Sequence, residues 1–583
     1  MLIARVVPNV TGLDKTFDYA VPDTIATPPR AGPHRVAVGD QVRVDLHGRR
    51  IGAWIVEVDP ADAHTDDLKP ITKWSSAGPA PDLVELSAWA AIRWAGRRRH
   101  FLQIASPPRN VTRSPNARRT GAVVEPRSPA SRRILESGGG VLRLPPTSDP
   151  MPAVLSAAGT GPTLVIVPGV DDAMLLAARL RRSGLTVAFV PDEWVAAVGG
   201  VDVVIGGRGA AWAPCPEMAA AVVIDEHDES LQEEGSPTWH ARDVVIERCR
   251  RLGVPVLLVS PCPTLTALEW GPLTRPPHAR ERAGWPIVDV IDRSADEPWK
   301  RSLVTSELIR HLRDVDRRVV CVSNTTGRAA LLACRSCKEL ARCERCGAAV
   351  VQDDRSRLVC RRCETERPPV CARCGAGRFA NLRPGVSRLR EELEAAAGRP
   401  AAAVTGAGWD GPRDAPVVVG TEAALHRVDR ADTVAFLDFD RELLSPRYRS
   451  GEQAMALLAR AARLVGPRAR GGRILVQTFL PEHDVVQAAL LADPGRLVPV
   501  EQERRRLLHL PPYGAYAEIG GARSDEYVAS LPDDHDESAG FVIVGADGEY
   551  AARAPDWMTL GRVLSAGERP PGSRLRIAVD PPR

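Results

Sequence analysis

Lysine is scarce in this 583-residue chain, and its absence from one long stretch limits the chemistry expected there. The five lysines are Lys15, Lys69, Lys73, Lys300 and Lys338. None lies between Trp74 and Trp299. A phosphate-binding P-loop of the form Gly-x4-Gly-Lys-Ser/Thr needs a lysine to neutralise the β- and γ-phosphates while backbone amides cradle them. This stretch therefore contains no such loop.

Long apolar runs and a charged-then-apolar leader are also missing. The chain begins MLIARVVPNV, and no apolar run reaches the roughly 18 residues of a membrane-spanning helix. We therefore expect a cytoplasmic protein in a reducing compartment, without a membrane partner.

Composition indicates a globular protein with several domains. With 44% hydrophobic and 26% charged residues, the chain is long enough for about three to five domains, each with a core of its own. The net charge of +4 is too small to indicate a nucleic-acid partner by itself. Whether the chain binds nucleic acid therefore has to be judged from where its charged residues lie along the sequence.

Eight of the twelve cysteines form four Cys-x2-Cys knuckles. The knuckles are Cys334/Cys337, Cys343/Cys346, Cys360/Cys363 and Cys371/Cys374. Zn²⁺ takes four thiolates at about 2.3 Å, and a two-residue gap lets both sulfurs of a knuckle face one ion. Eight thiolates therefore predict two zinc ions per chain, and the competing disulfide framework is disfavoured by a reducing compartment.

The spacing of the knuckles favours a nested pairing. Thirteen residues separate the two inner knuckles, which is hairpin length, so the inner four cysteines are expected to share one ion. Closing that ribbon brings the outer four together around a second ion. The alternative, pairing the first two knuckles, leaves only residues 338–342 to turn them face to face. The other four cysteines, Cys215, Cys249, Cys262 and Cys321, lie singly and are expected to be buried as small hydrophobes.

Five segments follow from the pattern of strands, helices and charge. Residues 1–105 read as a small β-rich module followed by one helix, and residues 106–145 as a basic linker or vestigial winged helix with eight arginines against two glutamates. That linker is either a solvated tether or a phosphate-binding arm.

Residues 146–295 and 296–500 alternate apolar strands with helices, as parallel α/β lobes do. The second lobe is interrupted by the zinc insertion at residues 334–374. A carboxy-terminal domain occupies residues 501–583.

An acidic pair ends one of the apolar strands. Asp225 and Glu226 close the strand AAVVIDE, where a Walker-B carboxylate would hold Mg²⁺ and its neighbour would position the attacking water. Two α/β lobes with such a pair predict an α/β protein built on two RecA-like helicase lobes.

Several strings along the chain together resemble the PriA family of replication restart proteins. They are TFDYAVP at 16–22, VVIDEHDES at 222–230, HARDV at 240–244, the knuckles beginning ACRSC, FLDFDRELLSPRYRSGEQ at 436–453, VQTFLPEH at 476–483, RRLLHLPPYG at 505–514 and the ending VDPPR. The resemblance runs over nearly the whole chain. It implies a DNA-binding ATPase and 3′-to-5′ helicase that acts at stalled replication forks.

The phosphate-binding half of that machinery departs from the family. The candidate loop SAAGTGPTLVIV at 156–167 lacks lysine, has Pro162 where an amide is needed, and leads into a strand instead of a helix. The acidic box reads DEH for the family's DEEH, and the coupling motif Ser-Ala-Thr appears as Ser260-Pro261-Cys262.

The second lobe departs from the family as well. Counting back without gaps from Val476 places Leu464 and Pro467 at the positions of the family's two γ-phosphate arginines. Loss of an arginine finger alone lowers the rate by roughly 10³ to 10⁵. Arg468, Arg470 or Arg473 are the candidates that would have to substitute. ATP turnover is therefore not expected.

The DNA-reading end matches the family better. Asp18 in the TFDY string corresponds to the carboxylate that accepts from the 3′-hydroxyl of a nascent leading strand, and Lys69 corresponds to a lysine of the same pocket. The alternative is that Asp18 begins a turn and Lys69 is solvated.

Together these observations predict a protein that binds stalled or branched forks and initiates primosome assembly without helicase activity. Its expected partners are branched and single-stranded DNA, single-stranded DNA-binding protein and primosome components. An active ATP-dependent 3′-to-5′ helicase is the alternative, and a scaffold whose zinc ribbons are its sole functional unit is a third reading.

Overall fold

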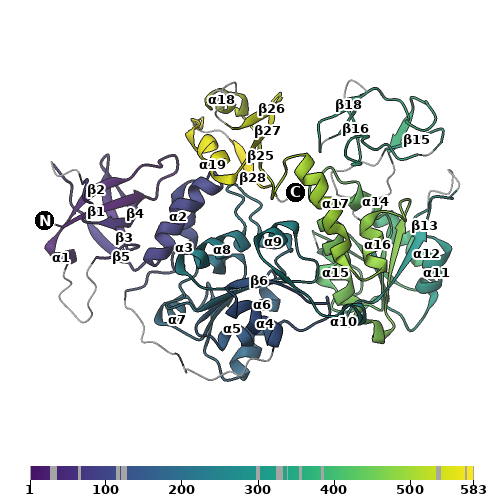
Figure 1. Cartoon of the computed structure of the whole chain (residues 1–583), viewed down its shortest axis with the longest axis horizontal. Coiled ribbons are helices and arrows are strands. Elements are labelled where there is room, and N and C mark those ends of the chain that lie inside the picture. The colour runs from purple at the N-terminus through teal and green to yellow at the C-terminus, as the bar shows by residue number, and fades with distance from the viewer. Residues whose placement is uncertain are drawn as a thin grey trace.

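The computed structural model describes most of the chain (Figure 1). It covers residues 2–583 except 27–35, 64–66, 113–118, 120–127, 297–301, 324–331, 338, 354–356, 361, 382–385, 407, 533–539, 571–573 and 582–583. Much of the predicted basic linker, with Arg113, Arg118 and Arg127, thus lies outside the described residues. No helix of the described part is both long and apolar enough to cross a membrane.

The amino-terminal module is an antiparallel sheet in the order β2-β1-β4-β3-β5, followed by two helices. Its elements are β1 (Leu2–Pro8), β2 (Phe17–Val21), α1 (Asp23–Ala26), β3 (Gln41–Leu46), β4 (Arg49–Val58), β5 (Lys73–Ser76), α2 (Pro81–Arg93) and α3 (Arg98–Ala105). Valines and aromatic residues alternate with polar residues along these strands, so one face of the sheet builds a small core.

Lobe 1 is a seven-stranded, fully parallel sheet in the order β12-β6-β11-β10-β7-β9-β8, with helices on both faces. Its elements are α4 (Pro129–Glu136), β6 (Gly139–Arg143), α5 (Met151–Ala158), β7 (Thr163–Ile166), α6 (Val170–Arg182), β8 (Val187–Val190), α7 (Trp194–Gly199), β9 (Val203–Gly206), η1 (Arg208–Trp212), β10 (Ala220–Ile224), η2 (Glu229–Leu231), α8 (Ala241–Leu252), β11 (Val256–Ser260), α9 (Leu265–Trp270), β12 (Leu273–Thr274) and α10 (His278–Ala283). Every residue of β6, β10 and β11 is buried, as a doubly covered parallel sheet requires.

Lobe 2 is also seven-stranded, in the order β13-β24-β23-β14-β22-β20-β21, and is parallel except for the edge strand β21. Its elements are β13 (Ile287–Asp292), α11 (Ser306–Arg313), β14 (Val319–Val322), α12 (Val386–Ala397), β20 (Ala401–Thr405), β21 (Gly408–Asp410), β22 (Val417–Gly420), α13 (Ala423–Arg427), β23 (Thr433–Phe436), α14 (Asp440–Leu443), α15 (Ser450–Val465), η3 (Arg468–Arg470), β24 (Arg473–Thr478), α16 (Asp484–Leu490), η4 (Pro494–Arg496) and α17 (Leu497–Leu507).

The cysteine-rich insertion leaves lobe 2 after β14 and stands above it in Figure 1. It contains β15 (Leu332–Cys334), β16 (Val351–Gln352), β17 (Leu358–Val359), β18 (Glu366–Arg367) and β19 (Phe379–Asn381). The amide of Ala349 donates to the carbonyl of Leu444 at 2.6 Å, and Arg362 donates to the carbonyl of Ser445. The insertion is thereby docked on lobe 2.

The carboxy-terminal domain is a four-stranded antiparallel sheet in the order β26-β27-β25-β28. Its elements are β25 (Ala515–Gly520), α18 (Ser524–Ala529), β26 (Val542–Ala546), β27 (Glu549–Ala554), α19 (Trp557–Ala566) and β28 (Arg576–Val579). Helix α19 packs on α2 so closely that a Cβ at Gly561 would lie 2.1 Å from the carbonyl oxygen of Ile92. Glycine is therefore required at this contact.

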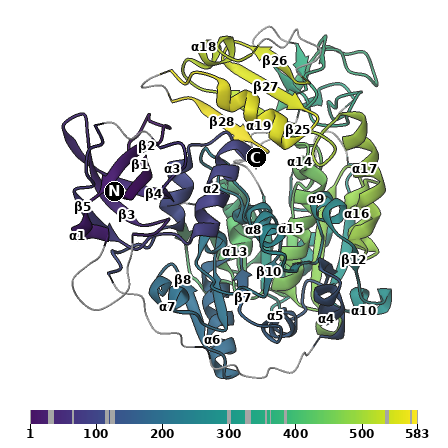
Figure 2. The same cartoon turned by 60° about the vertical axis from the view of Figure 1, so that its left-hand side comes forward.

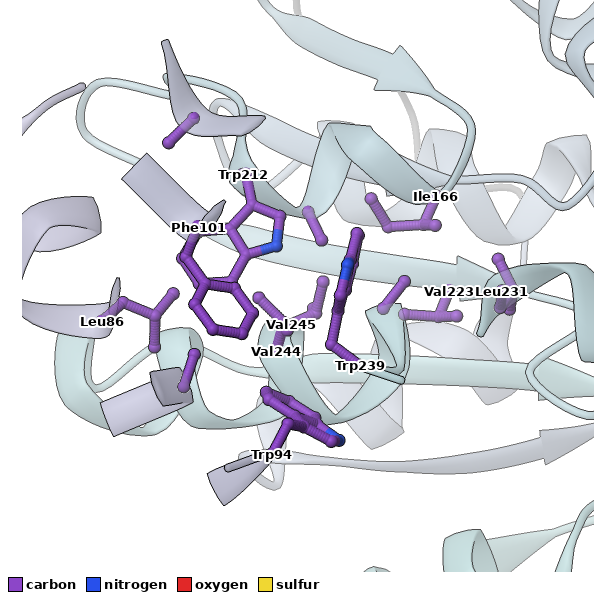
Figure 3. Packing of buried hydrophobic residues seen from close by; sticks show 14 of the residues in the cluster. Leu86, Trp94, Phe101, Ile166, Trp212, Val223, Leu231, Trp239, Val244 and Val245 are labelled. Atoms are coloured by element: carbon purple, nitrogen blue, oxygen red, sulfur yellow. The ribbon is translucent and has the colours of Figure 1, made fainter. Parts of the chain in front are cut away.

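The amino-terminal helices, lobe 1 and the carboxy-terminal sheet share one hydrophobic cluster. Figure 3 shows Trp94 and Phe101 of the amino-terminal module beside Trp212 and Trp239 of lobe 1. The ring centroids of Phe101 and Trp212 are 5.4 Å apart, and Trp94 is fully buried. These three regions are therefore one packed body, because burial of that apolar surface holds them together.

These elements confirm the predicted α/β class, with two RecA-like lobes, a cysteine-rich insertion and a β-rich amino-terminal domain. The structure places two of the expected boundaries elsewhere. Residues 129–145 are part of lobe 1, because α4 buries Ile134 and Leu135 and β6 pairs with β11 inside the sheet. Glycines and arginines in this segment hid a strand whose Gly139 and Gly140 admit neighbouring backbone. Lobe 2 begins earlier than residue 296, because β13 pairs with β24.

Candidate functional site

Asp225 follows directly after β10, at the carboxyl edge of the lobe 1 sheet. Both of its carboxylate oxygens accept from Arg463 of α15 in lobe 2, at 2.5 Å each. Burial alone would raise the pKa of Asp225, but the charge and hydrogen bonds of Arg463 outweigh it and hold that pKa below its usual value. The carboxylate predicted to hold Mg²⁺ is therefore ionised and neutralised by a guanidinium from the other lobe.

Strand β6 and helix α5 form the strand–loop–helix unit that would carry a phosphate-binding loop. Residues 144–150 are the loop of this unit. The SAAGTGP string predicted as the candidate instead ends α5 and leads into β7, with Gly159 as the residue that closes the helix. The loop at 144–150 contains Pro145, Pro146 and Pro150, which have no amide hydrogen to offer a phosphate. Its composition cannot reproduce an amide cradle.

Arg463 closes this loop onto the acidic edge. Its Nε donates to the carbonyl oxygen of Pro146 at 2.9 Å while its two terminal nitrogens hold Asp225. One guanidinium thus bridges the loop and the carboxylate between which a metal-bound phosphate chain would have to lie. Figure 2 shows α15, the lobe 2 helix that carries Arg463, and β10, the lobe 1 strand that precedes Asp225.

Glu226 is fully buried and engaged within lobe 1. Its Oε2 accepts from Arg242 at 3.0 Å and from the Thr264 hydroxyl at 2.9 Å, and its Oε1 accepts from the Thr264 amide at 2.7 Å. A general base has to reach the attacking water, and this carboxylate has no exposed surface. The next residue, His227, lies 2.9 Å from the hydroxyl of Ser260, and burial lowers its pKa, so it is neutral at pH 7.

In lobe 2, the two positions that correspond by count to the family's γ-phosphate arginines hold Leu464 and Pro467. Leu464 packs in the core of lobe 2, and Pro467 precedes η3. Of the three substitutes considered, Arg473 pairs with Asp289 within lobe 2 and Arg470 packs against Gly466. Counting without gaps gave Leu464, whereas the arginine that faces the acidic edge is the preceding residue, Arg463.

Further polar contacts join the lobes near the same edge. Arg460, one turn before Arg463 on α15, donates to Asp228 at 3.2 Å. Glu452, at the start of α15, accepts from the amide of Leu265 at 2.6 Å and pairs with Arg505 at 2.7 Å. Arg505 is fully buried, so the RRR run on α17 is in part structural.

The end of the chain reaches the same region. Asp580, just after β28, accepts from Arg449 at 2.5 Å and from the Tyr448 hydroxyl, and its carbonyl accepts from Gln232 of lobe 1 at 2.5 Å. Residue patterns alone did not single out Asp580. Its place in the ending VDPPR, one of the strings that carried the family resemblance, was the available signal.

The eight knuckle cysteines converge as two groups of four. Cys334, Cys337, Cys371 and Cys374 form one group, and Cys343, Cys346, Cys360 and Cys363 form the other. Sulfurs of opposing knuckles lie 3.4–3.6 Å apart. Four sulfurs at about 2.3 Å from a tetrahedral zinc ion lie about 3.8 Å from one another. The groups therefore fit the nested pairing and could each hold a zinc ion.

Contacts among the thiols favour one cysteine of each group as a thiolate, whereas burial raises the pKa of Cys337 and Cys343 and the hydrogen bond with Cys346 raises that of Cys360. The Cys360 thiol, as a hydrogen-bond partner, lowers the pKa of Cys346 to about 5. For Cys334, burial raises the pKa, but amide hydrogen bonds from the knuckle and contacts with neighbouring thiols lower it to about 6. Thiolates are the forms that bind zinc. The inner group is the more buried, since Cys374 of the outer group is exposed.

Asp18 and Lys69 lie close along the amino-terminal sheet but have different partners. Asp18 on β2 pairs with Arg5 of β1 at 2.8 and 3.2 Å, and its side chain is 10% exposed. Lys69 is held beside β2 by the bond from the Ala20 amide to its carbonyl, and its ammonium pairs with Asp45 at 3.3 Å. A carboxylate offers about four lone-pair sites, and the two bonds from Arg5 occupy part of those on Asp18.

Comparisons with known proteins found similarity in the amino-terminal module and over most of the chain. The family model of the PriA 3'DNA-binding domain (3'BD) matches residues 5–107. The chain is 26% identical to the replication restart protein PriA of Bacillus subtilis over 57% of this chain and 45% of that protein, so this alignment spans less than half of the relative. For PriA of Thermotoga maritima the values are 28%, 55% and 46%. The probable PriA of Mycobacterium tuberculosis is 28% identical over 88% of this chain and 85% of its own length.

Two solved structures cover much of the chain at low similarity. Dbp5 of S. cerevisiae, bound to RNA and ADP BeF3, has a TM-score of 0.35 and 12% identity over 74% of this chain and 98% of that chain. A DEAD box protein from Methanococcus jannaschii has a TM-score of 0.30 and 9% identity, with coverages of 65% and 91%. The sequence relatives therefore carry the comparison: the chain is similar to PriA-type replication restart proteins, because the model of the PriA 3′ DNA-binding domain matches residues 5–107 and mycobacterial PriA is similar over most of the chain.

Proposed function

We propose that this protein binds stalled or branched replication forks and initiates primosome assembly without ATP-driven unwinding. The match of residues 5–107 to a 3′ DNA-binding domain supports recognition of DNA. Similarity to replication restart proteins over most of the chain supports the process in which that recognition is used. The expected partners are branched and single-stranded DNA, single-stranded DNA-binding protein and primosome components, in the cytoplasm.

The proposed absence of ATP-driven unwinding is supported by one main observation. Arg463 holds both oxygens of Asp225 and the carbonyl of Pro146, while Arg242 and Thr264 hold Glu226. ATP hydrolysis needs a carboxylate that binds Mg²⁺, a group that orients water and donors that cradle phosphate. Here both carboxylates have protein partners, and the loop lacks lysine and several amide hydrogens.

Zinc would then support the fold of the insertion and take no part in a reaction. The two cysteine groups would each hold one Zn²⁺ through four thiolates, which is the closed coordination of a structural site. Because the insertion docks on Leu444 and Ser445 of lobe 2, metal binding would keep this docking surface ordered.

At the fork, Asp18 would accept a hydrogen bond from the terminal 3′-hydroxyl of the leading strand. Arg5 pairs with this carboxylate and fixes its orientation, and exposed Lys69, whose carbonyl is bonded to Ala20 of β2, would meet a flanking phosphate. A carboxylate repels a terminal phosphate, so the site would discriminate between a free 3′-hydroxyl and a blocked end.

Two matched forks test this proposal. One carries a 3′-hydroxyl at the junction, and the other carries a 3′-phosphate at the same position. We expect the wild-type protein to bind the hydroxyl fork several-fold more tightly and to hydrolyse no ATP with either. Equal affinity for both forks would contradict 3′-end recognition. Fork-stimulated ATP turnover would instead favour the alternative, an active 3′-to-5′ helicase.

A further inference from the structure

The acidic edge of lobe 1 is bound by two arginines from a single face of α15. Arg463 and Arg460 are three residues apart, which places them on neighbouring turns of one helix face. Arg463 pairs with Asp225 and Arg460 with Asp228, so two guanidinium groups of lobe 2 meet two carboxylates of lobe 1.

Both pairs lie in a region largely shielded from solvent. The carboxylates of Asp225 and Asp228 are 12% and 15% exposed, and the guanidinium groups of Arg463 and Arg460 are 37% and 25% exposed. Pairs shielded in this way are screened less by salt than surface pairs. Breaking one partner would also leave an uncompensated charge in a poorly solvated place.

Neighbouring contacts align with these pairs. Glu452 on the same helix accepts from the Leu265 amide in lobe 1, and Arg143 at the end of β6 donates to Asp493 in lobe 2 at 3.2 Å. Polar contacts between the lobes therefore also occur outside the two arginine pairs. The two arginines on α15 occupy the part of the acidic edge where a nucleotide would have to enter.

We propose that Arg460 and Arg463 form a permanent latch that replaces the nucleotide as the link between the two lobes. In a motor, closure of the lobes depends on a bound nucleotide whose phosphates and metal are contacted from both sides. In this chain the contact is made directly, carboxylate to guanidinium, so the lobes are held in one arrangement without a ligand. The inference rests on the proposed absence of a motor and assigns its structural consequence.

The latch has a functional corollary. A surface that spans both lobes would be formed at all times, so binding of a fork would not depend on a nucleotide cycle. The shared hydrophobic cluster already fixes the amino-terminal and carboxy-terminal domains to lobe 1. The latch would extend that rigid body to lobe 2.

Hydrogen–deuterium exchange across the lobes tests the latch in the full-length zinc-loaded protein. The variant R460A/R463A alters lobe 2, and exchange is read in lobe 1 peptides that cover residues 144–150 and 225–231. The variant D225A/D228A alters lobe 1, and exchange is read in lobe 2 peptides that cover residues 460–472. We expect exchange in the opposite lobe to rise roughly tenfold or more in both variants, because loss of the ion pairs lets the lobes separate. R182A, which changes an exposed arginine on α6, is the matched control and should leave both sets unchanged.

A charge-reversed variant distinguishes a latch from local damage. D225R/R463D restores an ion pair with the partners exchanged, so its exchange should return toward the wild-type rate. Unchanged exchange in the opposite lobe of both double-alanine variants would overturn the latch. If one variant fails to fold, the other still decides, because it alters only its own lobe. Loss of the latch would leave the absence of ATP turnover standing, whereas turnover by the wild-type protein would overturn the proposed function itself.

Discussion

Chemically capable side chains are gathered in opposite ways in the cysteine-rich insertion and in the cleft, by which we mean the acidic edge of lobe 1 with the loop at residues 144–150. In the cleft, Asp225 and Glu226 each have an arginine partner from the chain itself. In the insertion, the thiols of each group face one another across 3.4–3.6 Å. The first arrangement satisfies its own charges, whereas thiolates gathered in one place repel one another and could be neutralised by a metal ion.

The comparison shows that residue type alone does not identify a working site. Both regions contain strings that resemble those of PriA proteins, although the acidic box is one residue short, and both hold groups of the kind that bind divalent cations. The two regions differ in whether the protein itself supplies a partner of opposite charge for each carboxylate or thiolate. A guanidinium can be supplied by the protein, and once it is in place the carboxylate has lost the negative charge that would attract Mg²⁺.

The largest effect is expected in the insertion. Cys343→Ser should reduce the zinc content from two ions per chain to one and unfold the insertion locally, because structural zinc binding is coupled to folding. Mass spectrometry of the native protein counts the ions, and limited proteolysis reports the insertion. Cys249→Ser, at a buried thiol outside the clusters, should keep both ions. A wild-type content of one ion or none would contradict the nested pairing.

In the cleft region, the largest effect should come from Arg242. Arg242→Ala leaves the carboxylate of Glu226 buried without its charge partner, which should lower the free energy of unfolding by about 3–5 kcal/mol. Urea denaturation measures this change. Arg250→Ala, which removes an exposed pair with Glu247 on the same helix, should leave the midpoint unchanged. Equal effects of the two substitutions would mean that the Glu226 pair is not a buried, structural one.

A smaller effect is expected at the 3′-end site. Asp18→Ala removes one charge-assisted hydrogen bond, worth roughly 1.5–3 kcal/mol, from binding of a fork with a 3′-hydroxyl at the junction. Affinity for that fork should fall several-fold or more, while affinity for blunt duplex should stay the same. Lys73→Ala, at an exposed lysine of β5, is a control in the same sheet. Equal losses on both DNAs would show that Asp18, through Arg5, only supports the fold.

The smallest effect is a pH dependence of the Asp225–Arg463 pair. The pKa of Asp225 lies below its usual value in the folded protein, so its contribution to stability is fully present above the unfolded pKa of about 3.9 and is lost as pH falls through the folded pKa. The difference in unfolding free energy between wild type and Asp225→Ala should therefore be constant from pH 7 to pH 5 and shrink below about pH 4. His227 lies beside the same pair: burial lowers its pKa and the charge of Asp225 raises it, so removal of Asp225 also makes the ring harder to protonate. A difference that grows on acidification would contradict the ion pair.

The sequence predicted the strands of both lobes because short apolar runs such as AAVVI and PVLLVS leave few alternatives in a parallel sheet. It also predicted the cysteine pairing, which spacing constrains. It failed at β6, where glycines replace the apolar residues that mark a strand. It also failed at Arg463, because a position counted without gaps cannot show which face of α15 points to the other lobe. Asp580 was missed for a similar reason: its partners, Tyr448 and Arg449, are more than a hundred residues away.

The most direct test of the central claim is ATP binding and hydrolysis by the purified, zinc-loaded protein with forked DNA. Because Arg463 and Arg242 hold the two carboxylates, we expect no nucleotide binding in equilibrium dialysis and no ATP turnover above background, with or without DNA. Turnover that follows the protein through purification and disappears in Asp225→Ala would show that the cleft opens to bind Mg²⁺ and nucleotide, and would contradict the account.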